Sequence, residues 1–389
     1  MATRTERKFE FDIGANHLCN LYVEIKKYCK TFNIHFRPMK FLNYKIFRKG
    51  KARSIYKAVN PFTGMRLNWR LFASGKAGKG TDFFNLSTAT KFDHTNAYDF
   101  IKRKSGKTIA NYLADPFAST YQFHRAKEIS LGVMISVLSS IKTSLTEWEL
   151  HNTKGGMSAL PEAFAKRLNV KLKTPIQKVH VKKEGKIEVT TTTTEIFDAV
   201  VMASTATITK KLYKNPTEAQ QKVLTGSDYS TSISLAFEID ADKLDQTSII
   251  WVPHIESTKI SGITNELMKG KDFIKHGKSL ICAWVHEDYA KKIIKKSDKE
   301  IFELIKKELV KYTPWTNDAK DLTNYDIHRW NEAMPKFRPG HLTKVADFIK
   351  NGQGDKNVFF CGDFLNSPWT EGALRCGQRV AKRIVKKLK

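Results

Sequence analysis

Long apolar segments are missing from this sequence. No stretch approaches the roughly 18 uninterrupted apolar residues of a membrane-spanning helix, and the longer apolar runs, 199–203 and 279–285, are typical of buried strands. The N-terminus has no secretory signal, which predicts an intracellular, cytoplasmic protein. The five cysteines are scattered and form no C-x-x-C pair, so neither a disulfide framework nor a metal site is indicated.

Acidic residues are scarce. There are 39 Asp and Glu residues against 67 Lys and Arg residues, giving a net charge of +28. Either a general lysine bias at solvated positions or attraction to an anionic partner would explain this excess. Such a partner would be a membrane surface, which allows a peripheral membrane or quinone contact, or a carboxylate-bearing small-molecule substrate. No nucleic-acid partner is expected, because no nucleic-acid-binding motif accompanies the charge.

Patterning along the chain predicts mixed α/β structure. Apolar spacing predicts a helix around Leu21, Ile25 and Tyr28, and residues 95–150 are expected to be mainly helical. Asp115-Pro116 is expected to break one of those helices. Strands at 230–239, 249–253 and 279–286, with a charged helix near 297–312, predict a second lobe built on a sheet.

The segment from 155 to 207 is the most regular. A Gly155-Gly156-Met157 loop precedes a helix starting at Ser158, and then come strands at 176–181 and 187–193. A strand at 199–203 is expected to be buried. Together these elements predict a unit that packs on a nucleotide-binding sheet.

The C-terminal region combines a strand, a glycine turn and a helix. The strand 358–361 leads into Gly362-Asp363, and Glu371-Gly372-Ala373 opens the last helix. Free amides at that helix start would suit an electron-rich acceptor, such as a flavin carbonyl or a pyrophosphate. An ordinary strand–loop–helix connection with small packing residues explains the same pattern.

This region resembles the C-terminal flavin motif of flavin amine oxidases, protoporphyrinogen oxidases and phytoene desaturase-like enzymes. The resemblance implies FAD as the cofactor. It places Gly362 and Asp363 near the ribityl or phosphate part. It also implies that Glu371 is one of the cofactor-binding residues and that the residues after it, Gly372 and Ala373, offer backbone amides to the isoalloxazine ring.

Three further segments are similar to the same family, in the same order. Gly155-Gly156-Met157 and the strand after it imply that the backbone of Val179 meets the adenine. The stretch 11–15 resembles the family's extended segment near the flavin, which implicates Gly14 and Ala15. The stretches 329–335 and 339–341 are similar to the protoporphyrinogen oxidase-like branch.

The resemblance implies an α/β (α+β) fold. It consists of a Rossmann-like FAD-binding domain, truncated at its N-terminus, with an inserted mixed-sheet substrate-binding domain and a helical subdomain. The FAD-binding domain would comprise 1–40, 151–225 and 346–389, and the other parts 41–150 (substrate-binding and helical) and 226–345 (substrate-binding).

One family element is not found in the sequence. The G-x-G-x-x-G turn that seats a pyrophosphate is absent, and the stretch 74–80 is interpreted as a mobile surface loop. In register with the family, Thr3 takes the place of the threonine that follows a Gly-Gly-Arg. The resemblance therefore predicts that Met1 is an internal methionine, roughly 40 residues into the cofactor domain.

The most similar activity is that of protoporphyrinogen oxidase, in which flavin removes hydride from a tetrapyrrole. Amine oxidation, carotenoid desaturation and a flavin-free remnant are the alternatives. No catalytic acid or base is assigned, because hydride acceptance is the cofactor's own chemistry. Candidates by residue type alone are His17, His124, His254, His328 and His341. Lining of an apolar substrate cavity and packing in the core are equally compatible with Trp251, Trp284 and Trp330.

Overall fold

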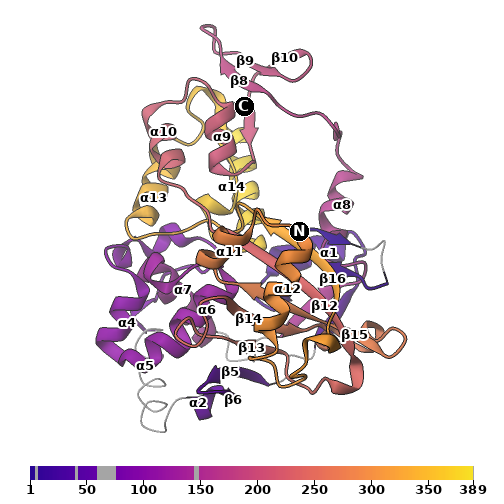
Figure 1. The fold of residues 1–389 in the computed structure, drawn as a ribbon. Coiled ribbons are helices and arrows are strands. Elements are labelled where there is room, and N and C mark those ends of the chain that lie inside the picture. Colours follow the sequence, from indigo (N-terminus) through magenta and orange to yellow (C-terminus); the bar gives the residue numbers. More distant parts are fainter. Residues whose placement is uncertain (5–7, 40–42, 59–75, 144–148, 389) are drawn as a thin grey trace.

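The computed structural model describes residues 1–4, 8–39, 43–58, 76–143 and 149–388. A seven-stranded sheet fills the lower part of Figure 1, a helical region packs beside it, and a smaller lobe containing the C-terminal helix stands above both. This mixed arrangement confirms the α/β fold class. None of the described helices is long and apolar enough to cross a membrane.

The large sheet is antiparallel apart from one parallel pair, β13 with β5. Its strands, in sheet order, are β16 (Thr323–Trp330), β12 (Ser232–Asp240), β15 (Lys278–Val285), β14 (Ile260–Asn265), β13 (Ile249–Trp251), β5 (Tyr44–Arg48) and β6 (Lys51–Ser54). Alternation along β12 turns Ile233, Leu235 and Phe237 toward one face. That face is covered by α11 (Glu287–Ile293) and α12 (Asp298–Leu309). Short turns link the strands: η4 (Ala241–Lys243), η5 (Glu266–Lys269), η6 (Lys271–Phe273) and η7 (Ala319–Asp321).

The opposite face of the sheet meets the helical region. The helical region comprises α2 (Ile55–Ala58), η1 (Leu86–Phe92), α4 (Ala97–Ser105), α5 (Lys107–Ile109), η2 (Ala110–Ala114), α6 (Asp115–Tyr121), η3 (Ala126–Glu128) and α7 (Leu131–Thr143). The prediction that Asp115-Pro116 breaks a helix is wrong. The chain stays helical from Lys107 to Tyr121, because a π-helical turn at Ala110–Ala114 precedes Pro116. The wider π turn interrupts the α-helical hydrogen-bond ladder just before the proline, so the missing amide of Pro116 does not end the helix.

The upper lobe contains a parallel pair and a three-stranded meander. The pair is β11 (Val200–Met202) with β17 (Val358–Phe360), and the meander is β8 (Lys178–Val181), β9 (Ile187–Thr190) and β10 (Thr194–Phe197). Its helices are α9 (Ala206–Leu212), α10 (Glu218–Thr225), α13 (His341–Asn351) and α14 (Thr370–Leu388), with short turns η8 (Asp355–Asn357) and η9 (Asp363–Leu365). Whereas β17 is fully buried, Val201 of β11 is 42% exposed. The prediction that 199–203 is wholly buried is therefore wrong at Val201 and at Ala203, which is also exposed, since apolar sequence alone cannot tell which face of a strand is covered.

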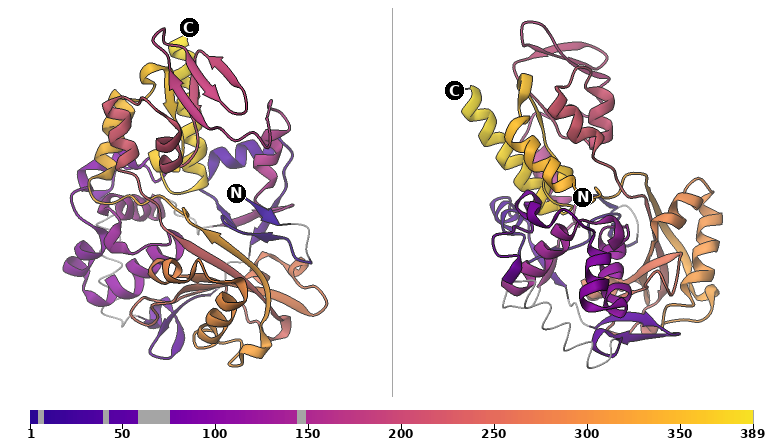
Figure 2. Two further views of the ribbon diagram at one scale, coloured as in Figure 1. Left: turned by 45° about the horizontal axis from the view of Figure 1, so that its top comes forward. Right: turned by 90° about the vertical axis from the view of Figure 1, so that its left-hand side faces the viewer.

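The N-terminal segment joins the two parts. Its elements are β1 (Thr3–Arg4), β2 (Phe11–Asp12), β3 (Leu18–Cys19), α1 (Val23–Thr31) and β4 (Phe36–Met39). The later strand β7 (Leu150–Thr153) pairs with β3 and β4, and α8 (Ala159–Ala165) follows it. Both views of Figure 2 place the N-terminus at the junction between the upper lobe and the large sheet. The predicted helix around Ile25 is confirmed, and Ser158 precedes α8 as expected.

Candidate cofactor and substrate site

Asp12 fixes the segment that leads to Gly14. It is buried at the end of β2, where Oδ1 accepts hydrogen bonds from Thr3 Oγ1 (2.7 Å) and Met157 N (2.9 Å). Oδ2 accepts from Asn152 Nδ2 (2.8 Å) and Lys269 Nζ (3.0 Å). Burial alone would raise the pKa of Asp12, but Lys269 and these donors outweigh it and lower the pKa. Asp12 is therefore a charged anchor between β2 and the Gly156-Met157 loop.

Lys269 is the buried cation of this anchor. Its ammonium lies 3.0 Å from Asp12 Oδ2 and 2.7 Å from Glu266 Oε2, and all three side chains are almost wholly buried. Burial opposes the charge, yet the two carboxylates raise the pKa of Lys269 above its ordinary value. The lysine therefore remains protonated and holds the N-terminal segment against η5.

Gly14 packs directly against a tryptophan. A Cβ built on Gly14 would lie 3.3 Å from Cζ2 of Trp330, and Trp330 Nε1 donates to the Ile13 carbonyl at 3.0 Å. Gly14 and Ala15 are both half-buried. The end of β16 thus sets the position of these two predicted cofactor residues.

Aromatic and small side chains alternate along a row that crosses the sheet. Because directly paired residues share a face, the register places on one face His328, Ser234, Trp284, Gly262 and Trp251. The ring of Phe123 stacks on Trp284 at 5.2 Å between centroids. Phe123 has a φ of 58°, an unusual backbone conformation for a bulky residue.

The three tryptophans separate into two groups. Trp284 and Trp251 are buried and pack against rings from the helical region, which is a core role. Trp330 is only half-buried, and its ring lies 4.3 Å from that of His328. Of the three, Trp330 therefore remains the candidate for contact with a bound molecule.

Asp363 is a carboxylate with few partners. The chain turns at Gly362, whose φ of 156° disfavours other residues, and the donors to Asp363 within the described chain are backbone amides of the turn, with Phe364 N at 2.8 Å. Burial raises the pKa of Asp363 to about 6. A half-buried carboxylate with spare acceptor capacity fits the hydroxyl groups of a ribityl chain, so the residues present agree with the cofactor that the resemblance implies.

The Glu371 carboxylate accepts hydrogen bonds from backbone amides of another helix, α1. Its oxygens accept from Glu24 N and Ile25 N, each at 2.9 Å, and from Arg375 Nε at 2.8 Å. A carboxylate suits the positive end of α1. Glu371 thus braces α1 against α14 and supports the site from behind.

Gly372 and Ala373 differ in what their backbone offers. The amide of Ala373 donates to the Trp369 carbonyl at 3.0 Å within the helix. The amide of Gly372 has no hydrogen-bond acceptor within the described part of the chain, as expected in a first helical turn. A Cβ on Gly372 would lie only 2.0 Å from Ser367 Oγ, so the glycine also permits close packing.

Val179 belongs to the upper lobe. It is buried in β8 and shares an apolar core with Phe360 and Phe364, the residues that flank the Gly362-Asp363 turn. Its carbonyl accepts from Lys214 N at 3.1 Å. Val179 and Asp363 are therefore brought into one lobe, whereas Gly14 and Ala15 lie at its junction with the large sheet.

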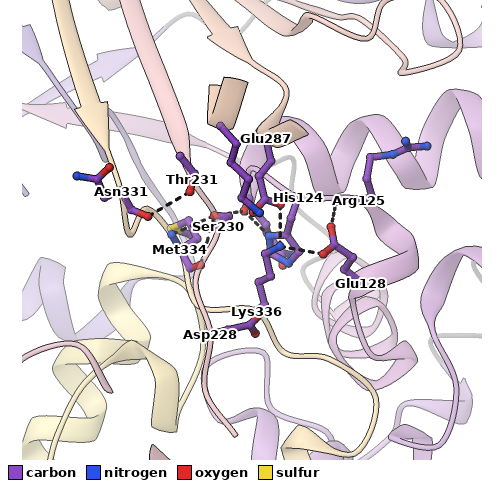
Figure 3. Close-up of polar contacts among 12 residues, drawn as sticks. His124, Arg125, Glu128, Asp228, Ser230, Thr231, Glu287, Asn331, Met334 and Lys336 are labelled. Carbon is purple, nitrogen blue, oxygen red and sulfur yellow. Dashed lines mark hydrogen bonds and ion pairs between the residues drawn. The ribbon is translucent and has the colours of Figure 1, made fainter. Parts of the chain in front are cut away.

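The loop after Trp330 is held by charges that the sequence did not reveal. Lys336 Nζ lies 2.8 Å from Glu128 Oε1 and 2.7 Å from Glu287 Oε2, as Figure 3 shows. Ser230 Oγ donates to the Met334 carbonyl at 3.3 Å. These partners come from η3, α11 and the segment just before β12, and no sequence pattern connects them.

The five candidate histidines have lowered pKa values. Burial is the leading cause that lowers the pKa of His17 and of His124 to about 4. It also lowers the pKa of His254, His328 and His341. These five side chains therefore favour their neutral form.

The glycine-rich stretch 74–80 lies partly outside the described residues. Gly78 is buried, and a Cβ there would lie 1.8 Å from Ser139 Oγ of α7. The expectation of a surface loop is therefore wrong at Gly78, which packs against the helical region and offers no phosphate site.

One family model and several solved structures match this chain over nearly its whole length. The model of the family described as flavin containing amine oxidoreductase matches residues 1–385. A putrescine oxidase variant with redesigned cofactor binding has a TM-score of 0.78 at 12% identity, covering 99% of this chain and 90% of its own. Cyclohexylamine oxidase from Brevibacterium oxydans has a TM-score of 0.77 at 13% identity, with coverage of 100% and 90%.

A protoporphyrinogen oxidase candidate from Exiguobacterium sp. 255-15 has a TM-score of 0.75 at 11% identity, covering 99% of this chain and 90% of its own. No curated protein matches the sequence. At these identities the solved structures show a shared fold and leave the substrate open.

Proposed function

The chain belongs to the flavin-containing amine oxidoreductase family, a family of FAD-dependent oxidoreductases, and we propose that its substrate is a largely apolar tetrapyrrole macrocycle of the protoporphyrinogen type. FAD supplies the chemistry of such a reaction by accepting a hydride. The contribution of this chain is to bind, orient and exclude water.

The cofactor part of the proposal rests on two regions. Asp363 has acceptor capacity for the ribityl hydroxyls, and the free amide of Gly372 can donate to a ring carbonyl. Gly14 and Ala15 offer backbone without bulky side chains next to Trp330. Val179 is proposed for the adenine end.

The substrate part rests chiefly on Trp330. Its half-buried ring, next to His328 and Gly14, gives the junction an aromatic surface that suits the pyrrole rings of an apolar macrocycle. Arg4 supplies a partly exposed cation at the same place, with Nη1 3.1 Å from Asp326 Oδ2 and Nη2 3.4 Å from His328 Nδ1. A cation beside an aromatic surface suits an apolar substrate with a carboxylate arm.

An amine is the second candidate. The face of an indole attracts an ammonium group, and Trp330 presents a partly exposed ring. On this alternative the reaction would oxidise a C–N bond. Arg4 disfavours it, because its guanidinium lies beside His328, whose ring contacts Trp330, and a cation there repels a cationic substrate.

The test has two stages. Purified protein is first examined for flavin absorbance, because a colourless folded protein that takes up no added FAD would refute the proposal. The flavin-loaded protein is then mixed without oxygen with a reduced porphyrinogen, a primary amine or a polyamine. Bleaching by the porphyrinogen alone is expected, and bleaching by amines alone would favour the second candidate. Arg4→Ala should weaken reduction by the porphyrinogen and leave reduction by an amine unchanged or faster.

A further inference from the structure

The two-stranded sheet of the upper lobe is closed at one edge and open at the other. The Met202 carbonyl of β11 accepts from Cys361 N, so by alternation the amide and carbonyl of Val201 point away from β17. At the far edge of β17, the side chain of Gln353 hydrogen-bonds to both backbone groups of Phe360. At the far edge of β11, no strand within the described residues pairs with Val201. One backbone donor and one acceptor are therefore free at this edge.

Parallel strands are an unusual place for an exposed edge. Parallel sheets are covered on both faces, whereas antiparallel sheets often leave one face in water. Yet the side chain of Val201 is exposed, and so is Ala203 directly after the strand. In the helix that follows, α9, Ile208 is exposed as well. Apolar side chains therefore lie open together with the free backbone groups of β11.

Large exposed apolar side chains are concentrated in this part of the lobe. Of the thirteen among the described residues, eight lie between 168 and 208, including the alternating Leu168, Val170 and Leu172. Residues 165–173 are exposed without exception, and Figure 1 shows this connection running from α8 to β8 apart from the helices of the lobe. Single apolar residues are normal on a surface, but such a concentration indicates an interaction site.

The same stretch is basic. Residues 166–214 contain eleven lysines and arginines and four acidic residues, and both Lys210 and Lys211 of α9 are exposed. Carboxylates on a partner would complement this charge. A lipid surface would complement it too, but lipid headgroups cannot continue a sheet. A polypeptide strand supplies an amide and a carbonyl to Val201, so the free backbone groups favour a polypeptide.

We propose that the open edge of β11 binds an extended polypeptide strand that is apolar in its middle and acidic at its ends. The backbone of this partner pairs with Val201 and becomes the third strand of the sheet. Its apolar side chains cover Val201 and Ala203, and its carboxylates meet the surrounding lysines.

The partner strand extends the sheet that positions the Gly362-Asp363 turn. β11 pairs directly with β17, and β17 leads into this turn. Pairing of β11 with a third strand therefore reinforces the strand pair on which the turn is mounted. The inference depends on neither the flavin nor the substrate, and its test does not need enzyme turnover.

The experiment measures binding of a peptide probe to the full chain by fluorescence anisotropy. The labelled probe alternates valine and threonine and carries two glutamates at each end. It should bind saturably, and its affinity should fall as salt is added, because salt screens the contacts between carboxylates and lysines. The same peptide N-methylated at every central amide cannot pair as a strand and should bind about tenfold more weakly or worse. Absence of saturable binding, or equal binding of the two peptides, would overturn the proposal.

Two variants place the binding at β11. Val201→Pro removes the outward amide without removing a hydrogen bond to β17, and it should weaken peptide binding about tenfold. Val201→Thr keeps both backbone groups and nearly the same shape, so this matched control should retain most of the affinity. Circular dichroism checks that each variant is folded. Parent affinity in a folded Val201→Pro chain would contradict the assigned edge.

Two other occupants of this surface have their own readouts. The chain is sedimented with phosphatidylglycerol vesicles, and its mass in solution is measured over a range of concentrations. Vesicle binding without peptide binding would assign the surface to a membrane. Dimerisation that excludes the peptide would assign it to a second copy of the chain. Either of these results would refute a separate polypeptide strand as the partner.

Discussion

The outer edge of β17 is completed by a glutamine side chain, and this contact can be tested quantitatively. Cys361 N donates to the Met202 carbonyl of β11, so by alternation the amide and carbonyl of Phe360 point away from β11. Gln353 meets both: Phe360 N donates to Oε1 at 2.9 Å, and Nε2 donates to the Phe360 carbonyl at 2.7 Å. The side-chain amide of Gln353 thus makes the two hydrogen bonds that a neighbouring strand would otherwise make with Phe360.

Gln353→Leu keeps the approximate volume of the side chain and removes both hydrogen bonds. Each orphaned buried backbone group costs about 1–3 kcal/mol, so the free energy of unfolding should fall by about 2–6 kcal/mol. Urea denaturation would show this as a lower midpoint with an unchanged slope. Gln177→Leu is the control, because Gln177 is exposed in the same lobe, and it should change stability by less than about 0.5 kcal/mol. A Gln353 variant as stable as this control would refute the reasoning.

Three other predictions follow from the site. Lys269→Met leaves the Asp12 carboxylate buried without its cation and should lower stability by about 3–5 kcal/mol in urea denaturation, whereas a change below 1 kcal/mol would contradict a structural role. The pKa of Asp363 is raised to about 6, so this group contributes stability that is present below the ordinary value of 3.8 and lost as the pH rises through about 6. Asp363→Asn should therefore gain stability relative to the parent apoprotein between pH 4 and 7, and a pH-independent difference would refute the shift. Gly372→Ala should lower the melting temperature through its clash with Ser367, and the added change Ser367→Ala should restore part of it; equal melting of the single and double variants would count against the clash.

The predicted site residues were easiest to find where backbone and glycine carry the role. The Gly362-Asp363 turn and the helix starting near Glu371 could be located because a strand, a turn and a helix leave a local pattern. The role of Glu371 could not be read in the same way. Its carboxylate meets amides of α1 that lie 346 and 347 residues away in the chain, and no local pattern records such a distant partner.

Local rules failed where tertiary packing overruled them. The sequence Asp115-Pro116 predicts a helix break, yet the helix continues, because a π-helical turn precedes the proline and accommodates its missing amide. The apolar sequence around Val201 predicts burial, but Val201 is exposed, because a strand sequence does not specify which of its faces another layer will cover. Trp284 is buried against the ring of Phe123, which comes from another part of the chain, and the sequence around Trp284 does not reveal this contact.

The sequence by itself determined the α/β class, the family and the flavin as cofactor, because these depend on the order and spacing of local elements. The tertiary structure decided which side chains are charged, buried or available. It paired Lys269 with Asp12, and Lys336 with Glu128 and Glu287. Such pairings arise from burial and contact between distant segments, and those exist only once the chain has folded.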